Sequence, residues 1–336
     1  MKRVALTYFL VLFLLQACKF GGSDNAPSAA WEMRPPKGVV CDTVSIDTMD
    51  LKNPFITYDR TTDSYCMTAD GGLVWVSDDL RTWRGPYDVL RYDTASWLGS
   101  SPVITSPEIH EFKGRYYFMA TFEVKEGGVT KRSCSTLVAD SLHGPYRTID
   151  AKSHLLDKAE TAAHPTFCKD YLGAGFMAYS RQSEKSGDAA VQIVMYSDDL
   201  GRRLGEAYKM MIASDVPWSH TVREGGKEPS PVLESPCLFD CGEESMGMLF
   251  TACNGAEKAV GVAYSETGTL NGPWIAEEKP LLEGVSGAAM FNDYDGTLVM
   301  VVSKDTLIGG VERSVPQLIK CDSQFEKLQI KGHYKF

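Results

Sequence analysis

One pattern of strand and turn signals recurs along the chain and limits the folds open to it. Each copy begins with an apolar strand led by proline, as at Asn53-Pro54, Ser106-Pro107, His164-Pro165 and Ser235-Pro236. Three copies close on a Gly-Pro-aromatic step, namely Gly85-Pro86-Tyr87, Gly144-Pro145-Tyr146 and Gly272-Pro273-Trp274. A fifth, weaker copy runs from about Gly287 through residues 298–302. Repeats of one β-rich unit therefore organise most of the chain.

Units of roughly 50 to 70 residues with about four strands each cannot bury both faces of their sheets alone. Radial stacking around a common axis solves this problem, so the sequence predicts an all-β fold, a five-bladed β-propeller. We expect the first and last segments to share a blade and close the ring, with residues 316–320 as the late strand. A pair of β-sandwiches is the alternative, but it leaves the Gly-Pro-aromatic steps unexplained.

The N-terminal segment is typical of an export signal. Lys2 and Arg3 precede an apolar run over residues 4–15, which is too short to span a bilayer. Cys18 follows a small residue after this run, where a bacterial lipoprotein signal is cleaved and lipidated. We therefore expect a signal peptide over residues 1–18, a flexible tether over 19–40 and the propeller over 41–336. An ordinary signal peptide cleaved elsewhere is the alternative.

The lipoprotein interpretation places the protein in the periplasm, or anchored at the outer membrane or cell surface, with the lipid as its membrane contact. Lys and Arg number 34 against 44 Asp and Glu, which gives a net charge of −10. Nucleic-acid binding needs a basic surface, so we expect no nucleic-acid partner. The cysteines show no metal-type spacing. Cys237 and Cys241 are either buried thiols or a bridge across a hairpin.

In a propeller the innermost strand of each blade lines the central axis, so residues near the blade starts meet at one mouth. At those points stand Asn53 in blade 1, Glu108 in blade 2 and Glu234 in blade 4. Two carboxylates in one apolar-walled pocket are what a glycosidase needs, one protonated to assist the leaving oxygen and one tuned or charged. Solvated surface charges are the plainer interpretation of both glutamates.

Residues 50–336 resemble glycoside hydrolase family 43. The resemblance rests on residues 53–59, 106–117, 234–236 and 260–274, which follow one another in the family's order. It implies a five-bladed propeller that hydrolyses arabinose-, xylose- or galactose-containing glycans with inversion. It also implies that Glu234 is the general acid, and that Glu108 sets the pKa of this acid and orients it.

Two positions depart from the family's pattern. Its general base is an Asp directly before Pro in blade 1, where this chain has Asn53, and an amide cannot take a proton from water near neutral pH. Residues 285–290 lack the blade 5 histidine that often lies near a channel ion, so a calcium ion is unsupported and we expect no required cofactor and no metal site. Asp50 or Asp47 could supply a relocated base. Because Asn and Asp have nearly the same shape, we expect Asn53→Asp to fit without repacking.

Four further residues are candidates for substrate binding. Trp97 before blade 2, and Trp218 with His220 before blade 4, offer surfaces that can stack on sugar rings. His164, directly before Pro165, could point into the channel as a polar contact or metal ligand. A hydrogen-bonded structural histidine is the alternative.

Other repeated residues are expected to be structural. Trp83 and Trp274 lie at strand ends, where they are expected to pack within blades. The matching acidic pairs Asp78-Asp79 and Asp198-Asp199 are expected to form turns.

The sequence thus predicts a glycoside hydrolase that acts on an oligosaccharide or polysaccharide from plant or host glycans. A catalytically silent glycan-binding lipoprotein is the alternative, because Asn53 replaces the expected base. A propeller that binds another protein and has no affinity for sugar is the third hypothesis.

Overall fold

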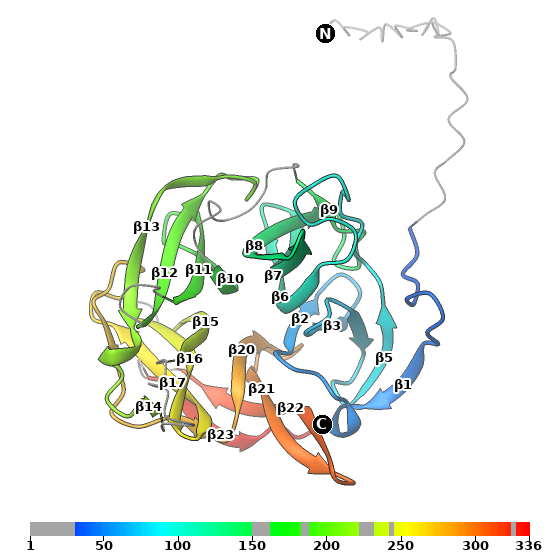
Figure 1. Cartoon of the computed structure of the whole chain (residues 1–336). Helices are drawn as coiled ribbons and strands as arrows, with labels where there is room; N and C mark the ends of the chain where they lie inside the picture. The colour runs from blue at the N-terminus through cyan, green and yellow to red at the C-terminus, as the bar shows by residue number, and fades with distance from the viewer. Residues whose placement is uncertain (1–30, 150–161, 183–187, 222–231, 242–244, 324–326) are drawn as a thin grey trace, which may run out of the picture. The chain divides into compact units, whose positions relative to one another are not determined.

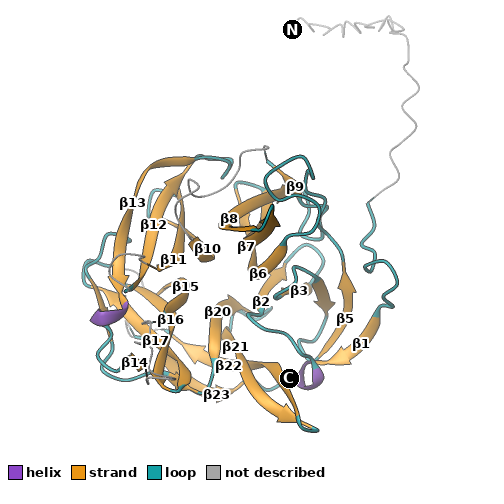
Figure 2. Cartoon of the chain, viewed as in Figure 1, coloured by secondary structure: helices purple, strands orange, loops and turns teal. Residues whose placement is uncertain are grey.

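Five β-sheets are arranged around a central axis in the compact unit formed by residues 33–336 (Figure 1). The structure is a computed structural model that describes residues 31–149, 162–182, 188–221, 232–241, 245–323 and 327–336. Within these residues, helical structure is limited to two 3-10 turns, η1 (Ile46–Thr48) and η2 (Ala213–Asp215) (Figure 2). The prediction of an all-β, five-bladed propeller is therefore confirmed.

Each sheet is one blade, and its strands come from one continuous stretch of chain. Blade 1 contains β1 (Asp42–Ser45), β2 (Phe55–Asp59), β3 (Ser64–Thr68), β4 (Val74–Ser77) and β5 (Thr82–Tyr87). Blade 2 contains β6 (Val103–Phe112), β7 (Arg115–Glu126), β8 (Val129–Ala139) and β9 (Arg147–Thr148). Blade 3 contains β10 (Ala162–Lys169), β11 (Gly175–Gln182), β12 (Ala189–Tyr196) and β13 (Arg203–Ile212).

The last two blades follow the same plan. Blade 4 contains β14 (His220–Thr221), β15 (Leu233–Asp240), β16 (Met246–Gly255), β17 (Glu257–Ser265), β18 (Trp274–Ala276) and β19 (Leu282–Glu283). Blade 5 contains β20 (Ser286–Asn292), β21 (Leu298–Ile308), β22 (Val311–Asp322) and β23 (Gln329–His333). The innermost strands β2, β6, β10, β15 and β20 surround the axis (Figure 1). Their starts therefore converge, although they are far apart in sequence.

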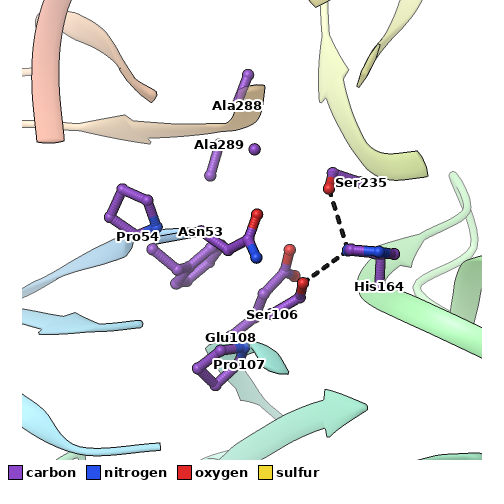
Figure 3. A pocket seen from close by; sticks show the side chains of 11 residues that line it. Asn53, Pro54, Ser106, Pro107, Glu108, His164, Ser235, Ala288 and Ala289 are labelled. Carbon is purple, nitrogen blue, oxygen red and sulfur yellow. Dashed lines mark hydrogen bonds between the residues drawn. The ribbon is translucent and has the colours of Figure 1, made fainter. Parts of the chain in front are cut away.

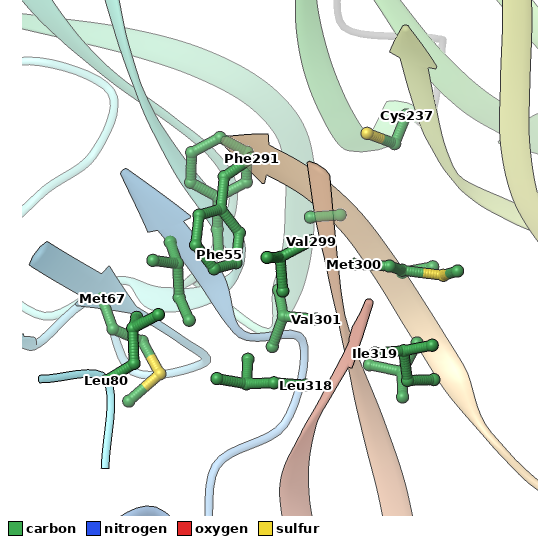
Figure 4. Packing of buried hydrophobic residues seen from close by; sticks show 14 of the residues in the cluster. Phe55, Met67, Leu80, Cys237, Phe291, Val299, Met300, Val301, Leu318 and Ile319 are labelled. Atoms are coloured by element: carbon green, nitrogen blue, oxygen red, sulfur yellow. The ribbon is translucent and has the colours of Figure 1, made fainter. Parts of the chain in front are cut away.

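Ring closure differs from the expectation that the terminal segments share a blade. β1 pairs with β5 in blade 1, whereas β22, which contains residues 316–320, pairs with β21 and β23 in blade 5. The two blades meet through a hydrogen bond from the Leu51 N–H to the Ser314 carbonyl (2.7 Å). They also share a hydrophobic cluster that includes Phe55, Phe291 and Leu318 (Figure 4). Each such buried side chain contributes about 1.5–3 kcal/mol, so packing closes the ring without strand exchange.

The residues expected to be structural have that role. Trp83 is fully buried and its Nε1–H donates to the Leu80 carbonyl (2.9 Å), while the buried Trp274 makes a similar bond within blade 4. Asp79 and Asp199 accept hydrogen bonds from backbone N–H groups two or three residues later, which fixes their turns. These predictions are confirmed.

All eight cysteines in the described part of the chain are free thiols. Cys237 and Cys241 do not form the bridge that was one of the two expectations. Cys237 lies in β15, and four residues of extended chain span about 13 Å, whereas the Cα atoms of a disulfide lie about 4.4–6.8 Å apart. Burial instead raises the pKa of the Cys237 thiol to about 12, as expected for an inert core residue.

The expected signal peptide, including Cys18, and the tether up to residue 30 lie outside the described residues. In the rest of the tether, the backbone of Arg34 forms an isolated antiparallel β-bridge with Asp88, just after the last strand of blade 1. No helix in the described part of the chain has the length and apolar character needed to span a membrane.

Candidate functional site

A ring of five residues, one from the start of each inner strand, surrounds the axis at the mouth of the channel. All five have positive φ: Asn53 (51°), Ser106 (48°), His164 (53°), Ser235 (53°) and Gly287 (62°). All five line one pocket, together with Pro54, Phe55, Pro107, Glu108, Ala288 and Ala289 (Figure 3). The left-handed conformation costs a residue other than glycine roughly 1–2 kcal/mol. Four ring positions nevertheless carry side chains, which points to a function for them.

The backbone of the ring is held by side chains from the preceding blade. The N–H groups of four ring residues donate to an oxygen in, or just after, the strand that pairs with the inner strand of that blade: Ser106 to Asp70 (2.7 Å), His164 to Thr121 (2.8 Å), Gly287 to Thr251 (3.0 Å) and Asn53 to Ser303 (2.9 Å). Sequence reasoning missed this set. Aligning the repeats would have shown it, and would have shown Asp70 as the acidic exception.

The side chain of Asn53 is held in place by Asp70. Its Nδ2 donates to both carboxylate oxygens of Asp70, at 3.0 and 3.2 Å. On its other side, a Cβ added at Gly287 would lie 2.6 Å from Asn53 Oδ1. The expectation that Asn53→Asp fits without repacking considered shape alone, whereas a carboxylate at position 53 would also face the carboxylate of Asp70.

No relocated base comes from the two upstream aspartates. Asp50 is exposed and accepts a hydrogen bond from the Ser314 N–H (2.9 Å), on blade 5. Asp47 is exposed within η1, and neither residue lines the pocket.

Glu108 and Glu234 lie near the ring, but they are not equivalent to Asn53. Glu108 stands two residues after the ring position of its blade and Glu234 one residue before, with a register irregularity between the inner strand and its neighbour in both blades. Glu108 has a 12% exposed side chain, and its Oε2 lies 2.6 Å from Nε2 of His110. The first partner of Glu108 is thus a histidine on its own strand.

Glu234 is held as an anion. Lys258, on β17 beyond the neighbouring strand β16, donates to its Oε1, and Nε2 of His164 lies 3.6 Å from its Oε2. Burial tends to raise the pKa of Glu234, but His164 and Lys258 outweigh burial and hold it below its usual value. Burial also lowers the pKa of His164, so its imidazole is neutral at pH 7. Lys258 supplies the positive charge beside Glu234 at that pH.

The charges beside Glu234 bear on the roles that the resemblance implies for the two glutamates, and those roles stay predictions. The groups that shift the pKa of Glu234 most are His164 and Lys258, not Glu108. A general acid must hold its proton at working pH, whereas a carboxyl with a lowered pKa has lost it. Lys258 was not found from the sequence, because only the pairing of β16 with β17 brings it beside Glu234.

His164 lines the pocket, as expected if it points into the channel, and it is also hydrogen bonded to neighbouring side chains. Its Nδ1 is 2.6 Å from Ser106 Oγ and 3.1 Å from Ser235 Oγ (Figure 3). The imidazole of His164 is therefore hydrogen bonded through Nδ1 to two serines, and its Nε2 faces the carboxylate of Glu234. In the described part of the chain, no group of three or more His, Cys, Asp or Glu side chains is placed to hold a metal ion.

The other residues predicted to bind substrate do not line this pocket. Trp97 packs edge-on against Phe122, with ring centroids 6.4 Å apart. Trp218 stacks on Phe250, at 6.0 Å and 10° between the ring planes, and packs as a partly buried residue against a hydrophobic core cluster of blades 3 and 4. His220 is exposed at the edge of blade 4, and its Nδ1 lies 3.0 Å from the Trp218 carbonyl. One face of the Trp218 ring is used in packing, and the sugar-stacking role of these three residues stays a prediction.

In this five-bladed propeller, residues from all five blades, among them acidic and polar side chains, meet at one axial mouth. Residues 45–305 match the model of the glycosyl hydrolases family 43. This match spans most of the chain, so the protein belongs to that family. The resemblance inferred from the sequence motifs is confirmed.

Solved structures show the same fold. The endo-arabinase from Bacteroides thetaiotaomicron VPI-5482 superposes with a TM-score of 0.73 at 24% identity, covering 84% of this chain and 99% of that one. An endo-1,4-beta-xylanase from the same organism gives 0.65 at 16% identity, covering 87% and 97%. The alpha-L-arabinanase from Cellvibrio cellulosa, complexed with arabinohexaose, gives 0.57 at 14% identity, covering 84% and 96%. A search of curated proteins found no match.

Proposed function

We propose that the ring pocket binds an arabinose- or xylose-containing glycan, and that the chain does not hydrolyse this glycan with the usual acid and base of its family. The observation that carries the proposal is the amide of Asn53, clamped to Asp70 at the position of the expected base. Family membership supports a glycan ligand, and a member of similar fold is known with arabinohexaose bound.

The proposed loss of hydrolysis follows from what inversion requires. One group must take a proton from water while another gives a proton to the leaving oxygen. The Asn53 amide cannot do the first, which is typically worth 10²–10⁴-fold in rate. Glu234 is ionised beside Lys258, so the second also fails in the unliganded protein.

Slow hydrolysis is the second candidate function. It is favoured by one observation, the presence of Glu108 in the pocket and of Glu234 beside it with a side chain that is still 23% exposed. Substrate binding that displaces Lys258 would allow Glu234 to take up a proton.

Calorimetry with arabino- and xylo-oligosaccharides, combined with chromatography of the same mixtures after long incubation, tests both candidates. We expect binding without products. Products that disappear in Glu234→Gln would establish the hydrolase instead, and the absence of binding to either series would refute the glycan ligand. Ile275→Ala, at an exposed position on β18, serves as the control for handling and folding.

We also propose that the protein is exported and anchored through a lipid on Cys18. The support is the order of charged, apolar and small residues before that cysteine. Cys18→Ser is expected to move the exported protein from the membrane fraction to the soluble fraction. Equal membrane partition of variant and parent would contradict the anchor.

A further inference from the structure

Three side chains in and beside the pocket form a line that a glycosidase does not need. Ser106 Oγ lies 2.6 Å from His164 Nδ1, and His164 Nε2 lies 3.6 Å from Glu234 Oε2 (Figure 3 shows the serine and the histidine). The three residues come from the starts of blades 2, 3 and 4, so the line exists only because the ring assembles. A hydroxyl, an imidazole and a carboxylate in this order are the parts of a serine hydrolase.

The protonation states fit this order. Burial lowers the pKa of His164, so its imidazole is neutral at pH 7 and can accept a proton. The carboxylate near Nε2 favours the tautomer with the hydrogen on that nitrogen, which leaves Nδ1 free to accept the hydrogen bond of Ser106. Lys258 keeps Glu234 charged, which is wrong for a general acid but right for stabilising an imidazolium.

We propose that the ring pocket hydrolyses acyl esters, with Ser106 as the nucleophile, His164 as the general base and Glu234 as a positioning residue. Apart from the ring residues and from Phe55 and Glu108, the pocket is lined by the small apolar side chains of Pro54, Pro107, Ala288 and Ala289. They fit a short acyl group such as acetyl. The substrate class is then an O-acetylated sugar. The sugar part of this assignment rests on the proposed function, whereas the acetyl part does not.

The reaction balances without any further reactant than water. Ser106 gives its proton to His164 Nδ1 while Oγ bonds to the acyl carbon. The bond from that carbon to the sugar oxygen breaks, and the proton on Nδ1 passes to this leaving oxygen. Water then attacks the acyl-serine, again losing a proton to Nδ1, and the carboxylic acid leaves as Oγ regains its proton.

Two donors line the same pocket and would stabilise the oxyanion of this reaction, the Nδ2–H of Asn53 and the hydroxyl of Ser235. Each would turn from its present partner, which is Asp70 for the amide and His164 for the hydroxyl. Ser106 is assigned as the nucleophile in preference to Ser235 because its Oγ is nearer to Nδ1, at 2.6 against 3.1 Å.

A fluorophosphonate probe followed by peptide mapping tests the nucleophile on the full exported chain. We expect the label on Ser106, its loss in Ser106→Ala and His164→Gln, and its retention in Ser141→Ala, an exposed serine outside the site. Labelling of Ser235 in the parent, or no labelling of a ring serine, would overturn the proposal. Urea unfolding of each variant separates loss of the nucleophile from loss of the fold.

Hydrolysis of 4-nitrophenyl acetate tests the roles of the other two residues. Ser106→Ala is expected to lower the rate by about 100-fold or more, and the rate of the parent should rise with pH as His164 loses its proton. Glu234→Gln is expected to move this rise to lower pH, because the carboxylate favours the protonated ring. An unchanged midpoint would remove Glu234 from the proposal. Glycan binding by Ser106→Ala, measured by calorimetry, tests the proposed function separately.

Discussion

Replacing the amide of Asn53 with a carboxylate is the sharpest test of the site. Asn53→Asp would exchange a donor that lies 3.0 and 3.2 Å from the Asp70 oxygens for an acceptor. Two charges about 3 Å apart repel by roughly 5 kcal/mol at an effective dielectric constant of 20. Keeping one carboxyl protonated at pH 7 costs about 4 kcal/mol, so the pair is expected to share one proton at neutral pH.

The consequence is a loss of stability that depends on pH. In the unfolded chain the new carboxyl ionises near pH 4, whereas in the folded chain its pairing raises the pKa of the pair. The penalty therefore starts near pH 4 and grows by about 1.4 kcal/mol per pH unit, to about 4 kcal/mol at pH 7. Urea unfolding of variant and parent at pH 4 and pH 7 measures it. An equal gap between the two proteins at both pH values would refute the contact of Asn53 with Asp70.

The double variant Asn53→Asp/Asp70→Asn is the matched control. It restores one amide and one carboxylate, with the amide oxygen at position 70 still able to accept the Ser106 N–H. We expect its stability to follow the parent across this pH range. Because the base position then holds an ionised carboxylate, the double variant should gain hydrolysis of 4-nitrophenyl arabinofuranoside, a substrate that needs little acid help, by roughly 10²-fold over the single variant.

Three other changes test the packing and charge of the site and of the blades. Gly287→Ala is expected to weaken glycan binding measured by calorimetry, because its Cβ would meet Asn53 Oδ1 at 2.6 Å; unchanged affinity would show that the ring can adjust. Lys258→Met is expected to raise the pKa of Glu234. The lowered pKa of Glu234 stabilises the folded parent at pH values above the ordinary pKa of Glu. This stabilisation is lost as the pH falls below that ordinary value and through the lowered pKa. The parent should therefore lose more unfolding free energy than the variant over this acidic range. Trp83→Ala should cost about 3–5 kcal/mol in urea unfolding, and a cost below 1 kcal/mol would contradict its core role.

The number of blades and the starts of the repeats, where the ring residues stand, could be predicted from the sequence because both depend on repeated local signals, although the sequence placed Glu108 and Glu234 at the equivalent points in place of Ser106 and Ser235. The residue before each Pro, such as Asn53 or His164, takes the same left-handed conformation in every copy, and the copies are spaced like blades. Gly287 lacks a following proline, yet its place in the fifth copy was still found. Repetition thus supplied evidence that one motif alone does not give.

The electrostatics of the site could not be predicted in the same way, because they depend on contacts between strands. Asp70 meets Asn53 from the turn after β3, and Lys258 meets Glu234 from the far strand of the β16–β17 hairpin. A register irregularity between Thr105 and Glu108 spans the ring residue of blade 2, and a pattern of residue types does not show where such an irregularity falls.

These contacts also show that Asn53 is not an isolated departure from the family pattern. Asp70 accepts hydrogen bonds from the Asn53 amide and from the Ser106 backbone, and Gly287 leaves the space that the Asn53 oxygen occupies. A carboxylate at position 53 is therefore opposed by Asp70, whose second bond holds the backbone of Ser106. The ring is built around an amide, and a single reversion to aspartate leaves two carboxyls that share one proton, without recreating a base.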